Sequence, residues 1–359
     1  MDFNDGPCVE IINRAAAYRI LMLDGKEVIH DATIEGKHWT RAHRKYFTNW
    51  KLEAYQSSGE KIFEHRFDLT NQNIRINIDS KSLGDSLAWL PQVQTFAQQH
   101  ATSRIYVSQF WLDLFDQSAY PELIFIDPAS TIENCYATYN IGYYFDHIPW
   151  HHPADPRTQP LGKIACDILG LQYTEKRPLL AAPEKNNHTV QRPYICIATA
   201  STAECKHWLY PEGWQIIIDY LRQMKFDVMV IQKEETSLQR INDQSGERSL
   251  GDRISQLKHC EFFIGLGSGL SWLAWAVGKP VVLIAGFSEP YTEFESDCYR
   301  VFNPEACHGC WNDTRYSFER GDWNWCPRHK GSERQFECSK LIDPDRVKAA
   351  IQKLLNNRR

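Results

Sequence analysis

Three absences narrow the classes of protein to which this sequence can belong. Basic residues are not in excess: 40 Lys and Arg against 45 Asp and Glu give a net charge of −5, which argues against a nucleic-acid partner. The nearest approach to a membrane span, Phe262–Gly278, has 17 residues with four Gly, so a buried strand–turn–helix is expected there. The N-terminus lacks the basic start and apolar run of a signal peptide. We therefore expect a cytoplasmic protein with no membrane span and no nucleic-acid partner.

The rest of the composition is that of a folded protein. Hydrophobic residues make up 43% and charged residues 24%, which excludes disordered, collagen-like and low-complexity chains. A length of 359 residues predicts two or three domains, since a domain has roughly 100–200 residues. Aromatic residues are abundant, at 13%, and the chain has 11 cysteines. An odd number of cysteines in a reducing compartment argues for a metal site rather than a disulfide framework.

Residues 1–70 are expected to form a β-rich, barrel-like domain. Two alternating runs, 18–23 and 26–30, flank Asp24-Gly25, a dipeptide typical of hairpin turns. A later pair of alternating runs has Ser58-Gly59 between them. Short strands at this spacing predict a small barrel or sandwich, and no residue in it suggests chemistry.

From residue 71 onward the pattern changes to strands that alternate with helices, which predicts parallel βαβ units. We expect a first Rossmann-like domain at 71–185, with a β-hairpin inserted near 132–146. A second such domain is expected at 190–359, after a polar, proline-containing linker, and Asp343-Pro344 predicts the start of its last helix. The fold class is therefore α/β, a pair of Rossmann-type domains in a GT-B-like arrangement with a cleft between them.

The first candidate site follows the first strand of the first α/β domain. In Lys81–Pro91, Gly84 permits a tight turn and close approach of a ligand, and Asp85 stands near the start of the next helix. Loops at the carboxyl ends of parallel strands face the ligand cleft in this kind of fold. Asp85 is thus a candidate general base, and the alternative is that it serves only as the N-cap of the helix.

Two further segments in the second domain suggest a nucleotide site. Ser201, Thr202 and Lys206 follow its first strand, where hydroxyls and a cation suit a diphosphate, and Lys233 follows the next strand. A solvated loop and a plain surface lysine are the alternatives. A glycine-rich strand-to-helix turn contains Gly267, Ser268 and Gly269, whose backbone N–H groups can approach phosphate oxygens. Close packing of helix on sheet would need the same glycines.

Four cysteines near the C-terminus have the spacing of a metal finger. Cys307, Cys310, Cys326 and Cys338 form the pattern C-x2-C-x15-C-x11-C, within 32 residues. Two residues between thiolates let both face one tetrahedral ion, and ligation by four sulfurs permits zinc or iron. The alternatives are four unrelated thiols, or ligation that involves His308, His329 or Asp313. Another group, His147, His151 and His152, is a metal or sugar site or else a loop packed with rings.

Together the Gly-Asp-Ser-Leu, Ser-Thr…Lys-His-Trp and Gly-Ser-Gly-Leu-Ser segments resemble the lipopolysaccharide-core heptosyltransferases that use ADP-heptose. The resemblance covers residues 72–300. With the β-rich N-terminus and the cysteine cluster, the chain is most similar to the bacterial autotransporter heptosyltransferases, which modify Ser residues of surface adhesins before export. One departure is at Gly267, where the lipopolysaccharide-core relatives have an Asp that binds the donor.

This resemblance implies transfer of heptose from ADP-heptose to Ser hydroxyls of an autotransporter adhesin passenger, with inversion at the anomeric carbon. Asp85 would accept the hydroxyl proton, since a Ser hydroxyl is a poor nucleophile. Lys206, Ser201, Thr202 and the backbone of 267–269 would stabilise the leaving ADP. The resemblance also implies one structural ferric iron per chain in a finger at 305–340, with zinc as the alternative. It further implies a homo-oligomer that this finger supports, with a dodecameric ring as one form of it.

Two other classes of function compete with this interpretation. A Rossmann-type oxidoreductase would use the glycine turn, but the turn lacks GxGxxG spacing and the acidic residue that should follow about twenty positions later. A non-enzymatic interaction module would use the four cysteines on an inactive GT-B scaffold, and the pairing of Asp85 with Lys206 would then be accidental.

Overall fold

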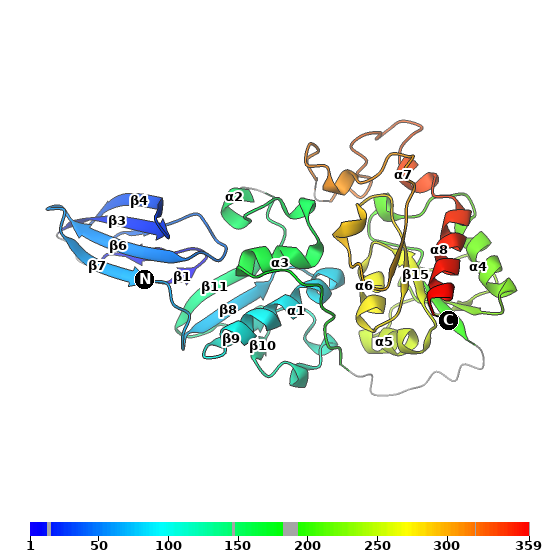
Figure 1. The fold of residues 1–359 in the computed structure, drawn as a ribbon, viewed down its shortest axis with the longest axis horizontal. Helices are drawn as coiled ribbons and strands as arrows, with labels where there is room; N and C mark the ends of the chain where they lie inside the picture. Colours follow the sequence, from blue (N-terminus) through cyan, green and yellow to red (C-terminus); the bar gives the residue numbers. More distant parts are fainter. Residues whose placement is uncertain (13–15, 146–147, 182–192, 320, 359) are drawn as a thin grey trace.

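The computed structural model describes residues 1–12, 16–145, 148–181, 193–319 and 321–358. Three parts follow one another along its longest axis: an antiparallel β region, a five-stranded parallel sheet and a six-stranded parallel sheet (Figure 1). No helix in these ranges is both long and apolar enough to cross a bilayer. The charge-free run 262–278 is instead a buried strand and helix, as predicted.

The antiparallel region is an open sheet, so the prediction of a barrel is wrong. Its four strands lie in the order β4-β3-β6-β7, which leaves β4 and β7 as edges, and β2 pairs separately with β5. The buried face does not close on itself, because Ile20, Met22 and Leu52 join the hydrophobic cluster of the first parallel sheet. The predicted turns are confirmed at Gly25 and Gly59. The strands are β2 Cys8–Glu10, β3 Ala17–Asp24, β4 Glu27–Glu35, β5 Trp39–Arg41, β6 Trp50–Gln56 and β7 Lys61–Arg66.

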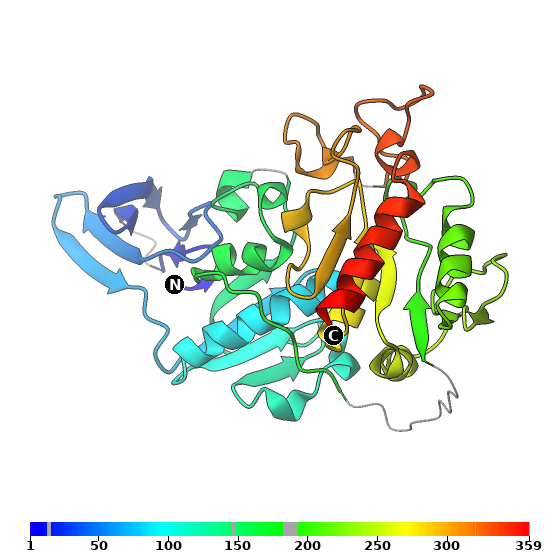
Figure 2. The same cartoon turned by 45° about the vertical axis from the view of Figure 1, so that its right-hand side comes forward.

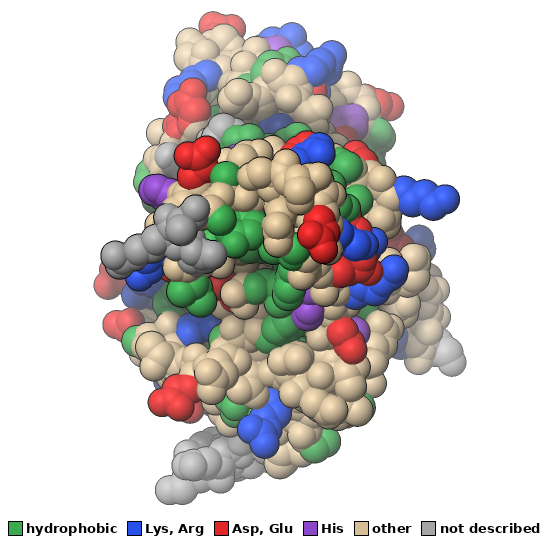
Figure 3. Space-filling view, turned by 90° about the vertical axis from the view of Figure 1, so that its left-hand side faces the viewer, with side chains coloured by type: hydrophobic (Ala, Val, Ile, Leu, Met, Phe, Trp, Pro, Cys, Tyr) green, Lys and Arg blue, Asp and Glu red, His purple; other side chains and the backbone are tan. Residues whose placement is uncertain are grey.

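The end of the molecule that carries this open sheet exposes hydrophobic side chains among charged ones (Figure 3). Large apolar residues of the region are well exposed, among them Trp39 at 65%, Val28 at 51% and Phe63 at 42%. This end therefore offers both edge strands and apolar surface to other chains.

The first parallel sheet has the order β1-β11-β8-β9-β10. The hairpin predicted near 132–146 is wrong: β11 pairs in parallel with β8 and on its other side with β1. The β-prone residues of this segment reflect a strand between two neighbours, with Ala137, Tyr139 and Ile141 buried. The chain's first strand thus belongs to this sheet and not to the antiparallel region. The elements are β1 Phe3–Asn4, β8 Asn73–Ile78, α1 Leu83–Gln99, β9 Arg104–Ser108, β10 Leu123–Ile126, β11 Cys135–Ile141, α2 Ile148–His151 and α3 Leu161–Leu169.

The second sheet is also parallel, in the order β14-β13-β12-β15-β16-β17. Asp343 caps the C-terminal helix as predicted, since its carboxylate accepts a 2.7 Å hydrogen bond from the amide of Asp345. The elements are β12 Tyr194–Ile197, α4 Gly213–Gln223, β13 Asp227–Val230, β14 Asn242–Asp243, α5 Leu250–His259, β15 Phe263–Leu266, α6 Gly269–Ala276, β16 Val281–Ile284, β17 Cys298–Val301, α7 Glu337–Lys340 and α8 Pro344–Asn357.

The two parallel-sheet units meet where α1 packs on α6 (Figure 2). A Cβ on Gly84 would lie 2.8 Å from Cδ1 of Trp272, and a Cβ on Gly269 would lie 3.0 Å from Cβ of Leu83. Both glycines therefore let the helices approach closely. Helices α1 and α6 each begin at the carboxyl end of a central strand. Their packing therefore brings the predicted loop before α1 and the glycine-rich turn before α6 face to face.

Candidate active site

One cavity of about 650 Å³ between the two parallel-sheet units collects the predicted site residues. It contains the candidate base, the candidate diphosphate loop and the glycine turn, which come from three separate segments of the chain. The predicted residues that line it are Asp85, Ser201, Thr202, Lys206, Lys233, Gly267, Ser268 and Gly269.

Asp85 lies in the first turn of α1, partly buried in the cavity wall. Ser82 is the N-cap of this helix, so the alternative that Asp85 only caps it is wrong. Burial raises the pKa of Asp85 to about 6, although hydrogen bonds from Ser80 and Ser82 and the positive charge of Lys206 act to lower it. The Ser80 hydroxyl donates to Oδ2 of Asp85 over 2.6 Å. A carboxylate with a pKa near 6 can accept a proton at neutral pH.

The loop of residues 199–206, here called the donor loop, is held from beneath by a buried glutamine. Oε1 of Gln232 accepts hydrogen bonds from the amides of Thr199 (2.6 Å) and Ala200 (3.2 Å), and the residue is 2% exposed. The sequence did not reveal that Gln232 supports this loop, because a glutamine after a strand gives no signal of its own. Lys206 extends from the same loop, with Nζ 5.9 Å from the ring centre of Phe287.

Lys233 lies at the rim of the cavity. Its side chain is 71% exposed, and Nζ is 3.3 Å from Oε1 of Glu247. Of these two lysines, Lys206 is the one whose charge lowers the pKa of Asp85.

The glycine turn borders a carboxylate that the sequence did not single out. A Cβ at Gly267 would lie 2.9 Å from Oε1 of Glu293, so a side chain at 267 would displace that carboxylate. Ser268 occupies the N-cap position of α6, and Gly269 packs against the first turn of α1. Glu293 stands 26 positions after the turn, and only the folded chain brings the two together.

The cysteine-rich finger forms part of the cavity wall. Trp311, Phe318, Asp322 and Trp323 all line the cavity. The carbonyl of Trp323 also accepts a 3.0 Å hydrogen bond from the amide of Glu204 in the donor loop. The finger is therefore continuous with the site.

The four finger thiols lie at the base of this segment, and the structure describes all 11 cysteines as free thiols. Cys310 and Cys326 are buried in one hydrophobic cluster with Cys205 and Phe287. Burial and the neighbouring thiols raise the pKa of Cys310 to about 12 and that of Cys338 further. Within the described ranges, no three or more His, Cys, Asp or Glu residues already stand at ligand spacing.

The donor set fits a metal that prefers sulfur, because the Cys338 thiol is within electrostatic range of the other three finger thiols and Asp313, one of the alternative ligands, is engaged in ion pairs. Asp313 forms ion pairs with Arg315 (2.7 Å) and Arg328 (2.9 Å), which hold the pKa of its carboxyl well below the usual range. His308 has Nδ1 2.8 Å from the carbonyl of Ala306.

The histidine group near Trp150 is packed against an aromatic ring, as far as it is described, and His151 ends the short helix α2 instead of lying in a loop. His151 stacks on Tyr144 with ring centres 4.8 Å apart, and Nε2 of His152 accepts a 3.2 Å hydrogen bond from the Tyr144 amide. Burial lowers the pKa of His152 to about 4. His147 lies outside the described residues.

Comparison with known proteins agrees with this geometry. The model of glycosyltransferase family 9 (heptosyltransferase) matches residues 169–293. Autotransporter heptosyltransferase BAHTCr of Citrobacter rodentium is 36% identical to this chain, over 98% of the chain and 88% of the relative. The chain belongs to the autotransporter heptosyltransferase family.

Other members of the autotransporter heptosyltransferase family extend the comparison. TibC of Escherichia coli is 36% identical over 98% of this chain and 89% of its own. Its crystal structure, described as an iron-containing dodecameric glycosyltransferase, superposes with a TM-score of 0.92, covering 100% of this chain and 96% of TibC. E. coli heptosyltransferase II shares the fold, with a TM-score of 0.56 at 14% identity over 80% of this chain and 99% of that one. BimC of Burkholderia thailandensis, at 30% identity over 98% of this chain and 85% of its own, is an inactive autotransporter heptosyltransferase, so the site has to be judged residue by residue.

Proposed function

We propose that this protein transfers heptose from ADP-heptose to Ser hydroxyls of an autotransporter adhesin passenger, with inversion at the anomeric carbon. The observation that carries the proposal is the meeting of Asp85, from one parallel-sheet unit, with Lys206, from the other, in one cavity. A solved structure of TibC contains ADP-D-β-D-heptose, and that chain is 33% identical to this one with a TM-score of 0.91, over 99% of this chain and 95% of TibC.

Each residue has a distinct part in this scheme. Asp85 accepts the proton of the Ser hydroxyl as its oxygen attacks the anomeric carbon, which is worth about 100- to 10,000-fold in rate. The ADP that leaves from the other side gains negative charge. Lys206, the hydroxyls of Ser201 and Thr202, and the backbone of 267–269 stabilise this charge. Lys233 adds positive charge at the rim.

The four cysteines would hold one structural iron, ferric in our proposal, with zinc as the alternative. TibC is described as iron-containing and dodecameric. Thiolate ligation by Cys307, Cys310, Cys326 and Cys338 would fix the fold of residues 305–340, and with it the cavity wall that this segment supplies. We propose a homo-oligomer of this chain, and a dodecameric ring is consistent with the TibC assembly.

The domain boundaries belong to the same proposal. We divide the chain into a β-rich unit up to about residue 70, an acceptor-side unit at 71–185 that also recruits β1, and a nucleotide-sugar unit at 190–359.

Co-expression with a candidate autotransporter tests the proposed function. The intact mass of the purified passenger should rise in steps of one heptose residue, and peptide mapping should place the additions on Ser. Co-expression of Asp85→Asn with the same passenger provides the control and should leave its mass unchanged. An unmodified passenger beside the wild-type enzyme, in a host shown to make ADP-heptose, would contradict the proposal.

A further inference from the structure

Glu293 is a buried carboxylate in the cavity wall to which the proposed mechanism assigns no part. The residue is 9% exposed and lies at the end of a short turn that follows β16. Ser288 donates a 2.9 Å hydrogen bond to Oε1, and Arg300 forms an ion pair with Oε2. Replacing a buried ion pair by apolar residues of similar size usually costs little stability. Stability alone therefore does not explain why Glu293 and Arg300 are paired here.

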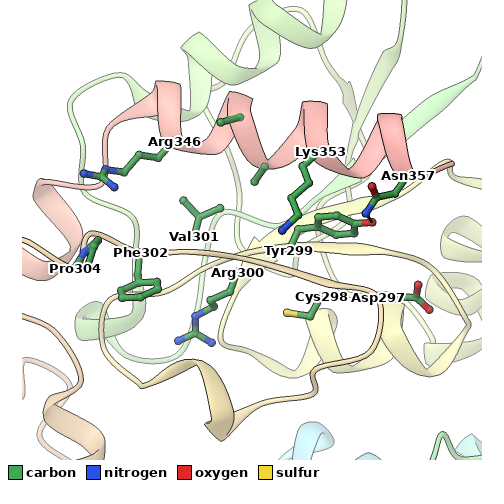
Figure 4. Close-up of a pocket in the computed structure, with 12 residues that line it drawn as sticks. Asp297, Cys298, Tyr299, Arg300, Val301, Phe302, Pro304, Arg346, Lys353 and Asn357 are labelled. Carbon is green, nitrogen blue, oxygen red and sulfur yellow. Dashed lines mark hydrogen bonds between the residues drawn. The ribbon is translucent and has the colours of Figure 1, made fainter. Parts of the chain in front are cut away.

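The contacts of Arg300 hold the Glu293 carboxylate in place. Arg300 lies on the edge strand β17 and points away from α8, whereas Val301 lies on the side of that helix (Figure 4). Besides Glu293, its guanidinium donates to the carbonyls of Ser288 (2.6 Å) and Ala285 (3.2 Å). The hollow between β17 and α8 that Figure 4 shows is thus on the opposite face from the ion pair.

Two observations show where the Glu293 carboxylate faces. Gly267 leaves room for it, since a Cβ there would lie 2.9 Å from Oε1. From the other unit, Tyr143 and Asp85 line the same cavity as Glu293. The two carboxylates therefore line one cavity, each contributed by a different parallel-sheet unit.

The cavity has positive charge at Lys206 and negative charge at Glu293. Lys206 and the donor loop suit an anionic diphosphate, which the negative charge of Glu293 would repel. A carboxylate can accept about four hydrogen bonds, and among the described residues Ser288 and Arg300 account for two of these on Glu293. The remaining acceptor sites suit a group that is rich in hydroxyls and carries no negative charge.

We propose that Glu293 accepts hydrogen bonds from hydroxyls of the donor's sugar and so orients the heptose beside Asp85. This inference rests on the proposed function, because it takes ADP-heptose as the donor. Arg300 is a positioning residue that acts through Glu293, and Gly267 keeps the space open.

Calorimetry with two ligands tests the proposal, because ADP lacks the sugar that Glu293 would contact. In Glu293→Gln we expect the affinity for ADP-heptose to fall roughly 10- to 100-fold, the usual effect of losing hydrogen bonds to a charged group. The affinity for ADP should stay within about twofold. Glu295→Gln, which neutralises an exposed carboxylate two residues away, is the matched control and should change neither affinity.

Glu293→Asp covers the case in which the glutamine variant fails to fold. It keeps the charge beside Arg300 but withdraws the oxygens from the cavity, so the loss should again be selective for ADP-heptose. Equal losses of ADP and ADP-heptose, or an unchanged affinity for both, would overturn the inference. A wild-type protein that binds ADP but not ADP-heptose would overturn the proposed function, and this inference with it.

Discussion

At the scale of single residues, the burial of Asp85 has opposite consequences for activity and for stability. The native pKa of about 6 lies above the ordinary 3.8, so the native state binds the proton more tightly than the unfolded state does. Its contribution to the free energy of unfolding is therefore most favourable below pH 3.8 and is lost as pH rises through 6. A neutral side chain at this position avoids that cost.

Asp85→Asn should lower the rate of transfer about 100- to 10,000-fold, because the variant has no base, while affinity for ADP-heptose stays within a few-fold. The variant should also be more stable at neutral pH, by about 1–3 kcal/mol, because the charged form is no longer desolvated. Initial rates, calorimetry and thermal unfolding check the three effects. Near-normal turnover together with lower stability would mean that Asp85 has a structural role only.

The same pKa predicts the pH dependence of the reaction. Because the base must be deprotonated, kcat/KM should fall as pH drops below about 6. Ser80→Ala removes a hydrogen bond that lowers this pKa, so the fall should begin at a higher pH in that variant. Ser80 is not among the residues that line the cavity, so the affinity of the Ser80→Ala variant for ADP should be unchanged. If the kcat/KM–pH profile of the variant superposes on that of the wild type, the fall in kcat/KM at low pH is not caused by protonation of Asp85.

The sequence predicts residues well where their chemistry depends on a strand end. Asp85 and Lys206 follow strands whose carboxyl ends face the cleft, and the cavity contains both. Gln232 and Glu293 could not be found in this way, because their roles depend on contacts with Thr199 and Gly267, which are 33 and 26 positions away in the sequence.

At the scale of elements, the finger joins the two parallel-sheet units through one asparagine. Nδ2 of Asn312 donates to the carbonyl of Arg157 in the first unit (2.6 Å), and its Oδ1 accepts from the amide of Glu289 in the second (2.8 Å). Arg157 in turn donates to the carbonyl of Tyr316 (2.6 Å). The finger therefore fixes the turn that precedes Glu293 to the opposite side of the cleft.

Asn312→Ala should lower kcat/KM roughly tenfold, because the buried groups that it satisfies lose about 1–3 kcal/mol of hydrogen bonding. The thermal unfolding temperature should fall as well. Asn324→Ala, in an exposed part of the same finger, is the control and should behave as the wild type in both assays. Equal kinetics for the two variants would show that the finger does not tie the units together.

Several elements could be predicted from the alternation of apolar and polar residues, as β3 and β4 show, since both overlap the predicted runs 18–23 and 26–30. The role of segment 135–141 could not be predicted from the sequence, because its β-prone residues suit a hairpin and a central parallel strand alike. Only the pairing with β8 and with the distant N-terminal β1 decides between them.

At the scale of the whole molecule, the metal, the donor loop and the assembly should be linked. Cys205 of the donor loop lies in the same hydrophobic cluster as Cys310 and Cys326. In Cys326→Ser we therefore expect the metal content to fall, the oligomer to dissociate and the affinity for ADP to weaken together. Cys135→Ser, in the first parallel sheet, is the matched control and should keep all three properties.

Elemental analysis and absorption spectra check the metal directly. About one iron per chain with a red thiolate-to-iron(III) absorption is expected, and a colourless protein with zinc would indicate the alternative ion. A Cys326→Ser protein that keeps its native oligomer and its affinity for ADP without metal would contradict the link.

The central claim, that Asp85 and the donor loop form one heptosyl-transfer site, is tested most directly with purified components. Wild-type protein and Asp85→Asn, each shown by calorimetry to bind ADP-heptose, are incubated with this donor and an unmodified passenger fragment, and the mass of the fragment is followed with time. We predict stepwise addition of heptose to Ser by the wild type and almost none by the variant. Equal modification by both proteins, or no modification by a wild type that binds the donor, would contradict the account.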